Sequence, residues 1–174
     1  FEARVWTYAL FSKKIRQQNF VGDSHFSCHK KDGAQSNQLG FILIILFELP
    51  VMHLLLHFLW SPFAASLTTG LTILGLVFFI AEYKAIAIRP ISIVPDSIIV
   101  RYGIWNPLII ALTEINQIQP NSNFIRRSGN VNRFNLAGNP NIEIKLNSGK
   151  LIYLGVDSPN EFISTIEKYR EKSL

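Results

Sequence analysis

The chain of 174 residues has a single cysteine, Cys28, which excludes a disulfide bond within the chain. It also lacks the common short motifs of nucleotide, hydrolase and metal chemistry: no P-loop, GxGxxG, GxSxG, HExxH or CxxC occurs. All four histidines lie between residues 25 and 57, so residues 58–174 have no side chain of the type most often used as a general base. These absences predict a protein that is not an enzyme.

Positive charge is absent from one long stretch. The chain is basic overall, with a net charge of +5, yet residues 39–83 contain no Lys or Arg. No dense basic run with interleaved aromatic residues occurs either, so the excess charge does not indicate nucleic-acid binding. Cations instead flank this stretch, with Lys30 and Lys31 before it and Lys84 and Arg89 after it, where they would face anionic lipid head groups.

Two apolar segments, 39–60 and 62–83, are separated only by Ser61. A membrane-spanning helix needs about 20 mostly apolar residues, so residues 39–84 are predicted to form a transmembrane helical hairpin. Trp60 lies where an aromatic belt is expected, and the basic flanks on both sides place the two ends of the hairpin in the cytoplasm. The domain that follows is therefore expected to be cytoplasmic.

Polar side chains inside the two segments are the candidate intramembrane contacts. Glu48 lies near the predicted bilayer midplane, where a carboxylate needs a proton, a partner or a protein surface. Folding the chain back at Ser61 puts His53 level with Thr68 and Thr69, which predicts a hydrogen bond from His53 to a threonine hydroxyl. On a straight helix Glu48 points about 140° away from His53, at about 100° per residue.

Three roles for these residues stay open on the sequence alone. Glu48 could bond a neighbouring helix, or it could relay protons. His53 or His57 could instead ligate haem or a chlorin, a chlorophyll-type pigment. Ser66 and Gly70 form a small-xxx-small pair that would let a partner backbone approach.

Residues 1–38 are predicted to be a membrane-proximal segment. Residues 1–17 fit a helix that lies in the membrane interface, is the tail of an earlier span, or is frayed. The chain is expected to be part of a longer or processed product because it begins at Phe1. Residues 22–38 are polar and predicted to form a loop. His25, Cys28 and His29 in this loop match no known metal-ligand spacing, so no metal site is expected.

Residues 85–174 change to short β-type segments. Strands are expected at 87–94, 97–104, 108–112, 114–119, 133–136, 141–146 and 150–156. Asp157 or Ser158 is predicted to cap a last helix, in which Phe162 and Ile166 are apolar. Residues 120–140 are rich in Asn and Gly and are expected to form a long loop, whose Arg126, Arg127 and Arg133 could contact anionic head groups.

Strands followed by one amphipathic helix match a small barrel or bent sheet closed by that helix. The segments RPISIVPDSIIVRYGIWNPLIIALTEINQI and IEIKLNSGKLIYLGVDSPNEFISTIEKY resemble bacterial pleckstrin-homology-like (PH-like) domains. With ELPVMHLLLHFLW and AEYKAIAIRP, the chain is similar over residues 39–172 to uncharacterised bacterial inner-membrane proteins of this layout. The resemblance implies an α+β membrane protein in the bacterial inner membrane. The first strand-to-strand loop, 94–97, has no basic residue, unlike PH domains that bind phosphoinositides.

The functional expectation follows from architecture rather than from a motif. A basic domain without catalytic motifs, held beside the bilayer, is expected to be an accessory or assembly subunit of a larger membrane protein complex. Its expected partners are lipids and other membrane subunits, with no nucleic acid and no resident cofactor. The alternatives are a haem- or chlorin-binding subunit that uses His53 or His57, and a regulator that binds anionic lipid.

Overall fold

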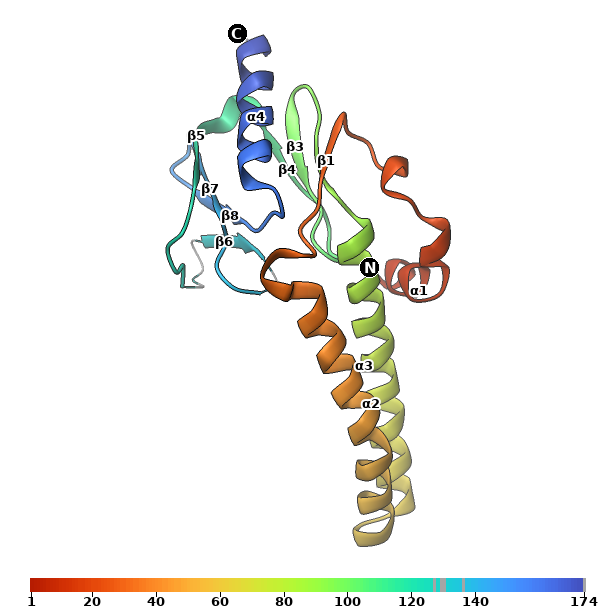
Figure 1. Ribbon diagram of the computed structural model, residues 1–174. Coiled ribbons are helices and arrows are strands. Elements are labelled where there is room, and N and C mark those ends of the chain that lie inside the picture. The colour runs from red at the N-terminus through yellow and green to blue at the C-terminus, as the bar shows by residue number, and fades with distance from the viewer. Residues whose placement is uncertain (127, 129–130, 136, 174) are drawn as a thin grey trace.

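The computed structural model describes residues 1–126, 128, 131–135 and 137–173 as an α+β chain with two long apolar helices followed by two β-sheets (Figure 1). The helices are α1 (Glu2–Phe11), α2 (Ala34–Leu59), α3 (Pro62–Ile88) and α4 (Pro159–Ser173). The strands are β1 (Ser24–Phe26), β2 (Ile91–Ile93), β3 (Ser97–Val100), β4 (Leu108–Ala111), β5 (Ile115–Pro120), β6 (Val131–Phe134), β7 (Ile142–Leu146) and β8 (Leu151–Leu154).

Helices α2 and α3 form the apolar hairpin, which projects from the sheets (Figure 1). The turn follows from the sequence, because Ser61 caps α3 by accepting a hydrogen bond from the Ala64 N–H at 3.0 Å and Pro62 occupies the first turn. Both Lys31–Leu59 and Pro62–Ile88 are long and apolar enough to cross a membrane. Only 6% of the most apolar window of each is buried inside the structure, so most of this surface has no protein cover.

The first sheet has the order β1-β2-β3-β4 and is antiparallel throughout. Its edge strand β1 precedes the hairpin in the chain and pairs with β2, with Ser24 opposite Ile93 and Phe26 opposite Ile91. The prediction of a loop over residues 22–38 is therefore wrong at this strand, and also over residues 34–38, which form the start of α2. The hairpin connects two neighbouring strands of one sheet, so it is held at both of its ends.

The second sheet has the order β5-β7-β8-β6, in which β6 runs parallel to β8 and the other pairs are antiparallel. Within the described residues the two sheets are separate, and no closed barrel is found, so the barrel alternative of the prediction is not supported. Among the described residues between 121 and 140, β6 is the only strand. It begins two residues before the strand expected at 133–136.

One core joins the two sheets and α4. The core residues include Ile93, Ile98 and Ile110 from the first sheet and Ile144 and Ile152 from the second. Phe162 of α4 is fully buried and meets Phe26 of β1 edge-to-face at 5.0 Å between ring centroids. Segments on both sides of the hairpin in sequence thus share one core.

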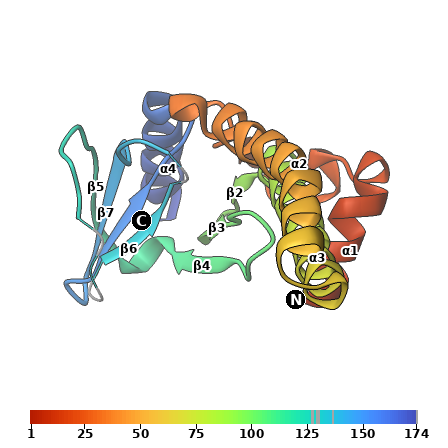
Figure 2. The same cartoon turned by 90° about the horizontal axis from the view of Figure 1, so that it is seen from below.

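Helix α1 packs against α3 at the end of the hairpin nearest the sheets and lies across the hairpin axis, on the side away from the sheets (Figures 1 and 2). Tyr8 is buried in this contact, and the Lys84 ammonium donates a hydrogen bond to the Ala9 carbonyl at 2.7 Å. The helix ends at Phe11, earlier than the predicted residue 17, and short 3-10 turns follow at Ser12–Lys14 and Gln17–Asn19.

Candidate functional site

A groove of about 250 Å³ runs between α2 and α3, halfway along the apolar hairpin. Its polar lining is Glu48 and His53 from α2 and Thr68, Thr69 and Thr72 from α3. Gly75 also lines it, and a side-chain carbon placed there would meet nothing within 4 Å. The polar groups that the sequence distributes over two helices thus border one groove.

His53 is anchored across the hairpin. Its Nδ1 lies 2.7 Å from the hydroxyl of Thr69, which is one of the two threonines that the residue levels place opposite His53. The two side chains come from opposite arms of the hairpin, so the bond fixes the register of α2 against α3. The Thr72 hydroxyl donates to the Thr68 carbonyl at 2.9 Å, which leaves its oxygen free to accept a bond from outside.

Glu48 lines the same groove but stays exposed, and no hydrogen bond or ion pair involves its side chain within the described residues. On a straight helix the side chains of Glu48 and His53 would point about 140° apart. Both nevertheless border the groove, because it is formed by two helices and is wide enough to reach both. Pro50 lies between them in α2.

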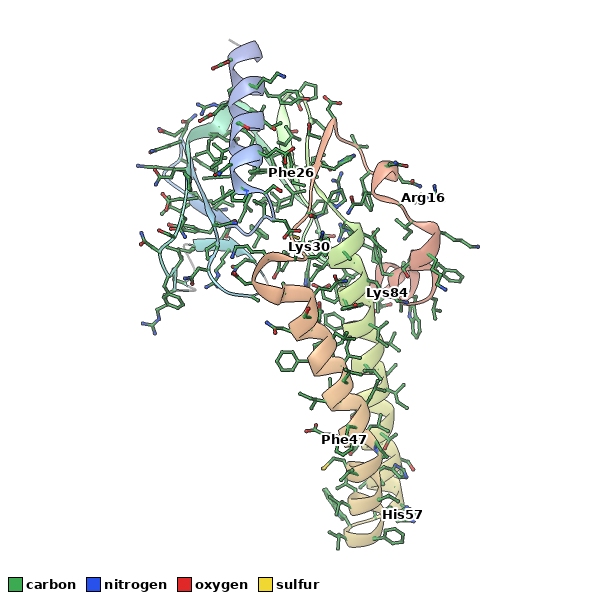
Figure 3. All side chains as sticks on the ribbon, in the orientation of Figure 1. Arg16, Phe26, Lys30, Phe47, His57 and Lys84 are labelled. Atoms are coloured by element: carbon green, nitrogen blue, oxygen red, sulfur yellow. The ribbon has the colours of Figure 1, made fainter. Side chains whose placement is uncertain are left out.

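His57 lies one turn beyond His53, toward the far end of the hairpin (Figure 3). The two rings stack at 6.1 Å between centroids with an interplanar angle of 21°. Parallel rings on one side of one helix cannot bind opposite faces of the same flat macrocycle, so each haem or chlorin would have at most one of them as a ligand. No group of three or more His, Cys, Asp or Glu side chains suited to a metal occurs in the part of the chain that the structure describes.

The cations predicted to contact head groups fall into two sets. Those engaged with protein include Arg89, Lys84 and Arg133, which donates to the Ile125 carbonyl at 2.8 Å. Lys31 pairs with Asp32. Lys30 and Arg126 are exposed, and neither side chain has a partner among the described residues, whereas Arg127 lies outside them.

Sequence reasoning missed a clamp where α3 meets the first sheet. The Glu82 carboxylate accepts a hydrogen bond from the Ile104 N–H at 2.8 Å, and the Arg89 guanidinium donates to the carbonyls of Gly103 and Trp105. Arg89 is only 5% exposed, and burial lowers the pKa of its guanidinium. The predicted strand at 97–104 stops at Val100 because Gly103 has a φ of +51° and the loop turns into this clamp.

A second clamp holds the segment that enters α2. The Asp157 carboxylate accepts hydrogen bonds from the Ser27 hydroxyl at 2.6 Å and from the Lys31 N–H at 2.8 Å. The sequence predicts Asp157 or Ser158 as a helix cap, but the Asp157 side chain is used for this tertiary contact. The contact spans 126 residues and has no local sequence signal.

Comparisons of the chain with protein-family models, with curated proteins and with solved structures found no match. The resemblance to bacterial PH-like membrane proteins therefore stays a prediction.

Proposed function

We propose that this chain is a non-enzymatic, membrane-anchored accessory or assembly subunit of a larger membrane protein complex. In this proposal the apolar hairpin spans the bilayer, and a helix of a partner subunit docks in the groove at Glu48. The observation that carries the proposal is the exposed Glu48 carboxylate, which has no partner in the described chain although it lies in the middle of an apolar helix.

A carboxylate in the hydrocarbon region is unfavourable unless it is neutralised or bonded, and such residues face protein partners far more often than lipid. The groove around Glu48 also offers the Thr72 hydroxyl as an acceptor and an open approach over Gly75. The occupant that fits is a transmembrane helix with a cationic or hydrogen-bond-donating side chain, because Glu48 and Thr72 both present oxygen atoms.

The orientation follows from the flanking charges. Cations precede α2 and follow α3, so both ends of the hairpin and the β-sheets would be cytoplasmic, in the inner membrane if the predicted bacterial family is correct. Helix α1 would lie in the interface of that leaflet. Trp6, Leu10 and Phe11 are all about half exposed or more, and aromatic and apolar side chains of this kind are favoured at that depth.

Lipid regulation is a second candidate function, favoured by the exposed Lys30 and Arg126. Each cation near an anionic leaflet contributes about 1 kcal/mol, so two of them would adjust the position of the domain rather than anchor it. Binding to vesicles by the hairpin-containing protein that did not change with anionic lipid content or salt would remove this candidate.

The docking proposal is tested with a photo-crosslinking amino acid at position 52, because Met52 lines the groove and is 46% exposed, so that Glu48 itself is retained. The matched control is the same amino acid at position 47, where Phe47 is 76% exposed and lies outside the groove lining. In native membranes we expect position 52 to crosslink to a transmembrane segment of one partner, and position 47 to crosslink mainly to lipid. Glu48→Leu should release that partner on gentle detergent extraction, while Glu48→Gln, which can still form hydrogen bonds, should retain part of it. Equal crosslinking at both positions, or a partner indifferent to Glu48→Leu, would contradict the proposal.

A further inference from the structure

A second pocket, of about 270 Å³, lies above the groove, at the end of the hairpin nearest the sheets. It is lined by Ala34, Asn37, Gln38 and Phe41 from the first turns of α2, by Phe79 of α3, and by Ala137 from the loop after β6. Its walls combine two amide side chains with two aromatic rings. A volume of this size far exceeds the roughly 30 Å³ that one water molecule occupies.

Gln38 gives this pocket an unsatisfied polar group. The residue is only 7% exposed, and its Oε1 is fully buried without a hydrogen-bond partner in the described chain. Buried side-chain oxygens nearly always have a partner, whether protein, water or ligand. A carbonyl oxygen can only accept, so the missing partner is a group that donates an N–H or O–H.

The position of the pocket narrows the ligand further. The first turns of α2 lie at the same end of the hairpin as Lys30 and Lys84 (Figure 3), which is the head-group level if the hairpin spans a bilayer. The helix dipole at the N-terminus of α2 favours a phosphate nearby, although the Ala34 N–H already bonds the Lys31 carbonyl and the Gln35 N–H the His29 carbonyl. Phe41 and Phe79 line the pocket and suit methylene groups.

We propose that this pocket binds one phospholipid whose head group carries a hydrogen-bond donor. On binding, the Gln38 amide turns its buried Oε1 toward the pocket to accept the donor's hydrogen bond, and an acyl chain leaves past Phe41 and Phe79 along the hairpin. The ammonium of an ethanolamine head group and the hydroxyls of a glycerol head group share this chemistry, whereas a choline head group has neither N–H nor O–H. The inference rests on the bilayer insertion that is part of the proposed function, but not on the docking of a partner at Glu48.

Head-group selectivity tests the proposal directly. The purified full chain is reconstituted into vesicles with equal parts of phosphatidylethanolamine, phosphatidylglycerol and phosphatidylcholine of identical acyl chains, then extracted gently and analysed by native mass spectrometry. We expect one retained lipid, with a donor head group preferred over choline by about tenfold, the effect of one hydrogen bond in a buried site. Preference for ethanolamine alone assigns the ammonium as the donor, and equal retention of ethanolamine and glycerol lipids assigns the shared donor chemistry.

Gln38→Met keeps the length of the side chain but removes the acceptor, so it should abolish the preference. Gln35→Met, one turn earlier on α2 and outside the pocket lining, is the matched control and should retain it. Equal retention of all three lipids by the unmodified chain, or an unchanged preference in Gln38→Met, would overturn the inference. If Gln38→Met does not fold, the unmodified chain alone decides. A chain that does not enter vesicles at all refutes the insertion, and so the proposed function, rather than the lipid site alone.

Discussion

The same kinds of side chain have opposite surroundings in the apolar hairpin and in the β-sheets. Phe162 and Ile144 are fully buried in the core of the sheets, while Phe47 and Phe58 of the hairpin are more than three quarters exposed. The hairpin surface thus carries the same types of apolar residue as the core, but no part of the described protein covers them. The comparison teaches that composition alone does not distinguish a protein core from an apolar surface without protein cover, whereas the exposure of matched residues does.

The largest expected difference between the two regions comes from removing one phenylalanine ring in each. Phe162→Ala should destabilise the chain by about 3–5 kcal/mol, because it opens a cavity between α4 and β1. Phe47→Ala removes an exposed ring and should leave the unfolding of the sheets unchanged. Urea unfolding of the detergent-solubilised protein, followed by circular dichroism, measures both. A similar loss in the two variants would break the comparison.

The reactivity of the Cys28 thiol is a second test of the difference between buried and exposed side chains. Burial raises its pKa from the ordinary value of 9.0 to about 12, and the negative charge of Asp157 adds to the shift. At pH 8 we therefore expect alkylation about a thousandfold slower than for an exposed cysteine, since only the thiolate reacts. Because the folded pKa is raised, the thiol's contribution to stability is present below pH 9 and decreases as the pH rises toward 12.

An added cysteine at exposed Asn160 provides the internal control for this measurement. Mass spectrometry should show one rapid label, at position 160, and a second only after denaturation. Rapid labelling of Cys28 in the native protein would mean that the segment entering α2 is not held as described.

The Asp157 clamp tests how firmly the sheets hold the hairpin. Asp157→Ala removes the acceptor of the Ser27 hydroxyl and the Lys31 N–H, and we expect a loss of about 2 kcal/mol in unfolding free energy. Asp157→Asn retains one acceptor oxygen and should lose less. Protease cleavage before α2 should increase in the same order, and an unchanged cleavage rate in Asp157→Ala would show that the contact does not restrain this segment.

The smallest effect is expected inside the hairpin. His53→Leu removes the bond to Thr69, and side-chain hydrogen bonds between membrane helices contribute only about 0.6 kcal/mol on average. A small shift in thermal stability is therefore expected. Absorbance spectra of the purified variants test the haem or chlorin alternative. If the unmodified protein has a visible absorbance band and His53→Leu or His57→Leu lacks it, the substituted histidine is a pigment ligand.

The sequence predicts the hairpin well because its signal is local. Ser61 and Pro62 mark the turn, and the absence of Lys and Arg over residues 39–83 marks the two long helices. A bond from His53 to a threonine is also predictable, since residue levels in a hairpin follow from distance to the turn, but the choice of Thr69 over Thr68 depends on how the two helices pack.

The parts that escape prediction depend on distant contacts. Strand β1 has only three residues and lies in a polar segment. It forms a strand because it pairs with β2, which follows it in the sequence only after the whole hairpin. Gly103 ends the alternating pattern of β3 because Glu82 and Arg89 hold the loop in which it lies.

The central claim is that the hairpin surface is covered by lipid. A spin label at position 47 in the full chain, reconstituted into vesicles, tests it most directly, and the buried Cys28 should stay unlabelled. The account predicts high accessibility to oxygen, which dissolves in hydrocarbon, and low accessibility to a water-soluble nickel chelate. High accessibility to the nickel chelate, or low accessibility to both reagents, would place position 47 in water or inside protein and contradict the account.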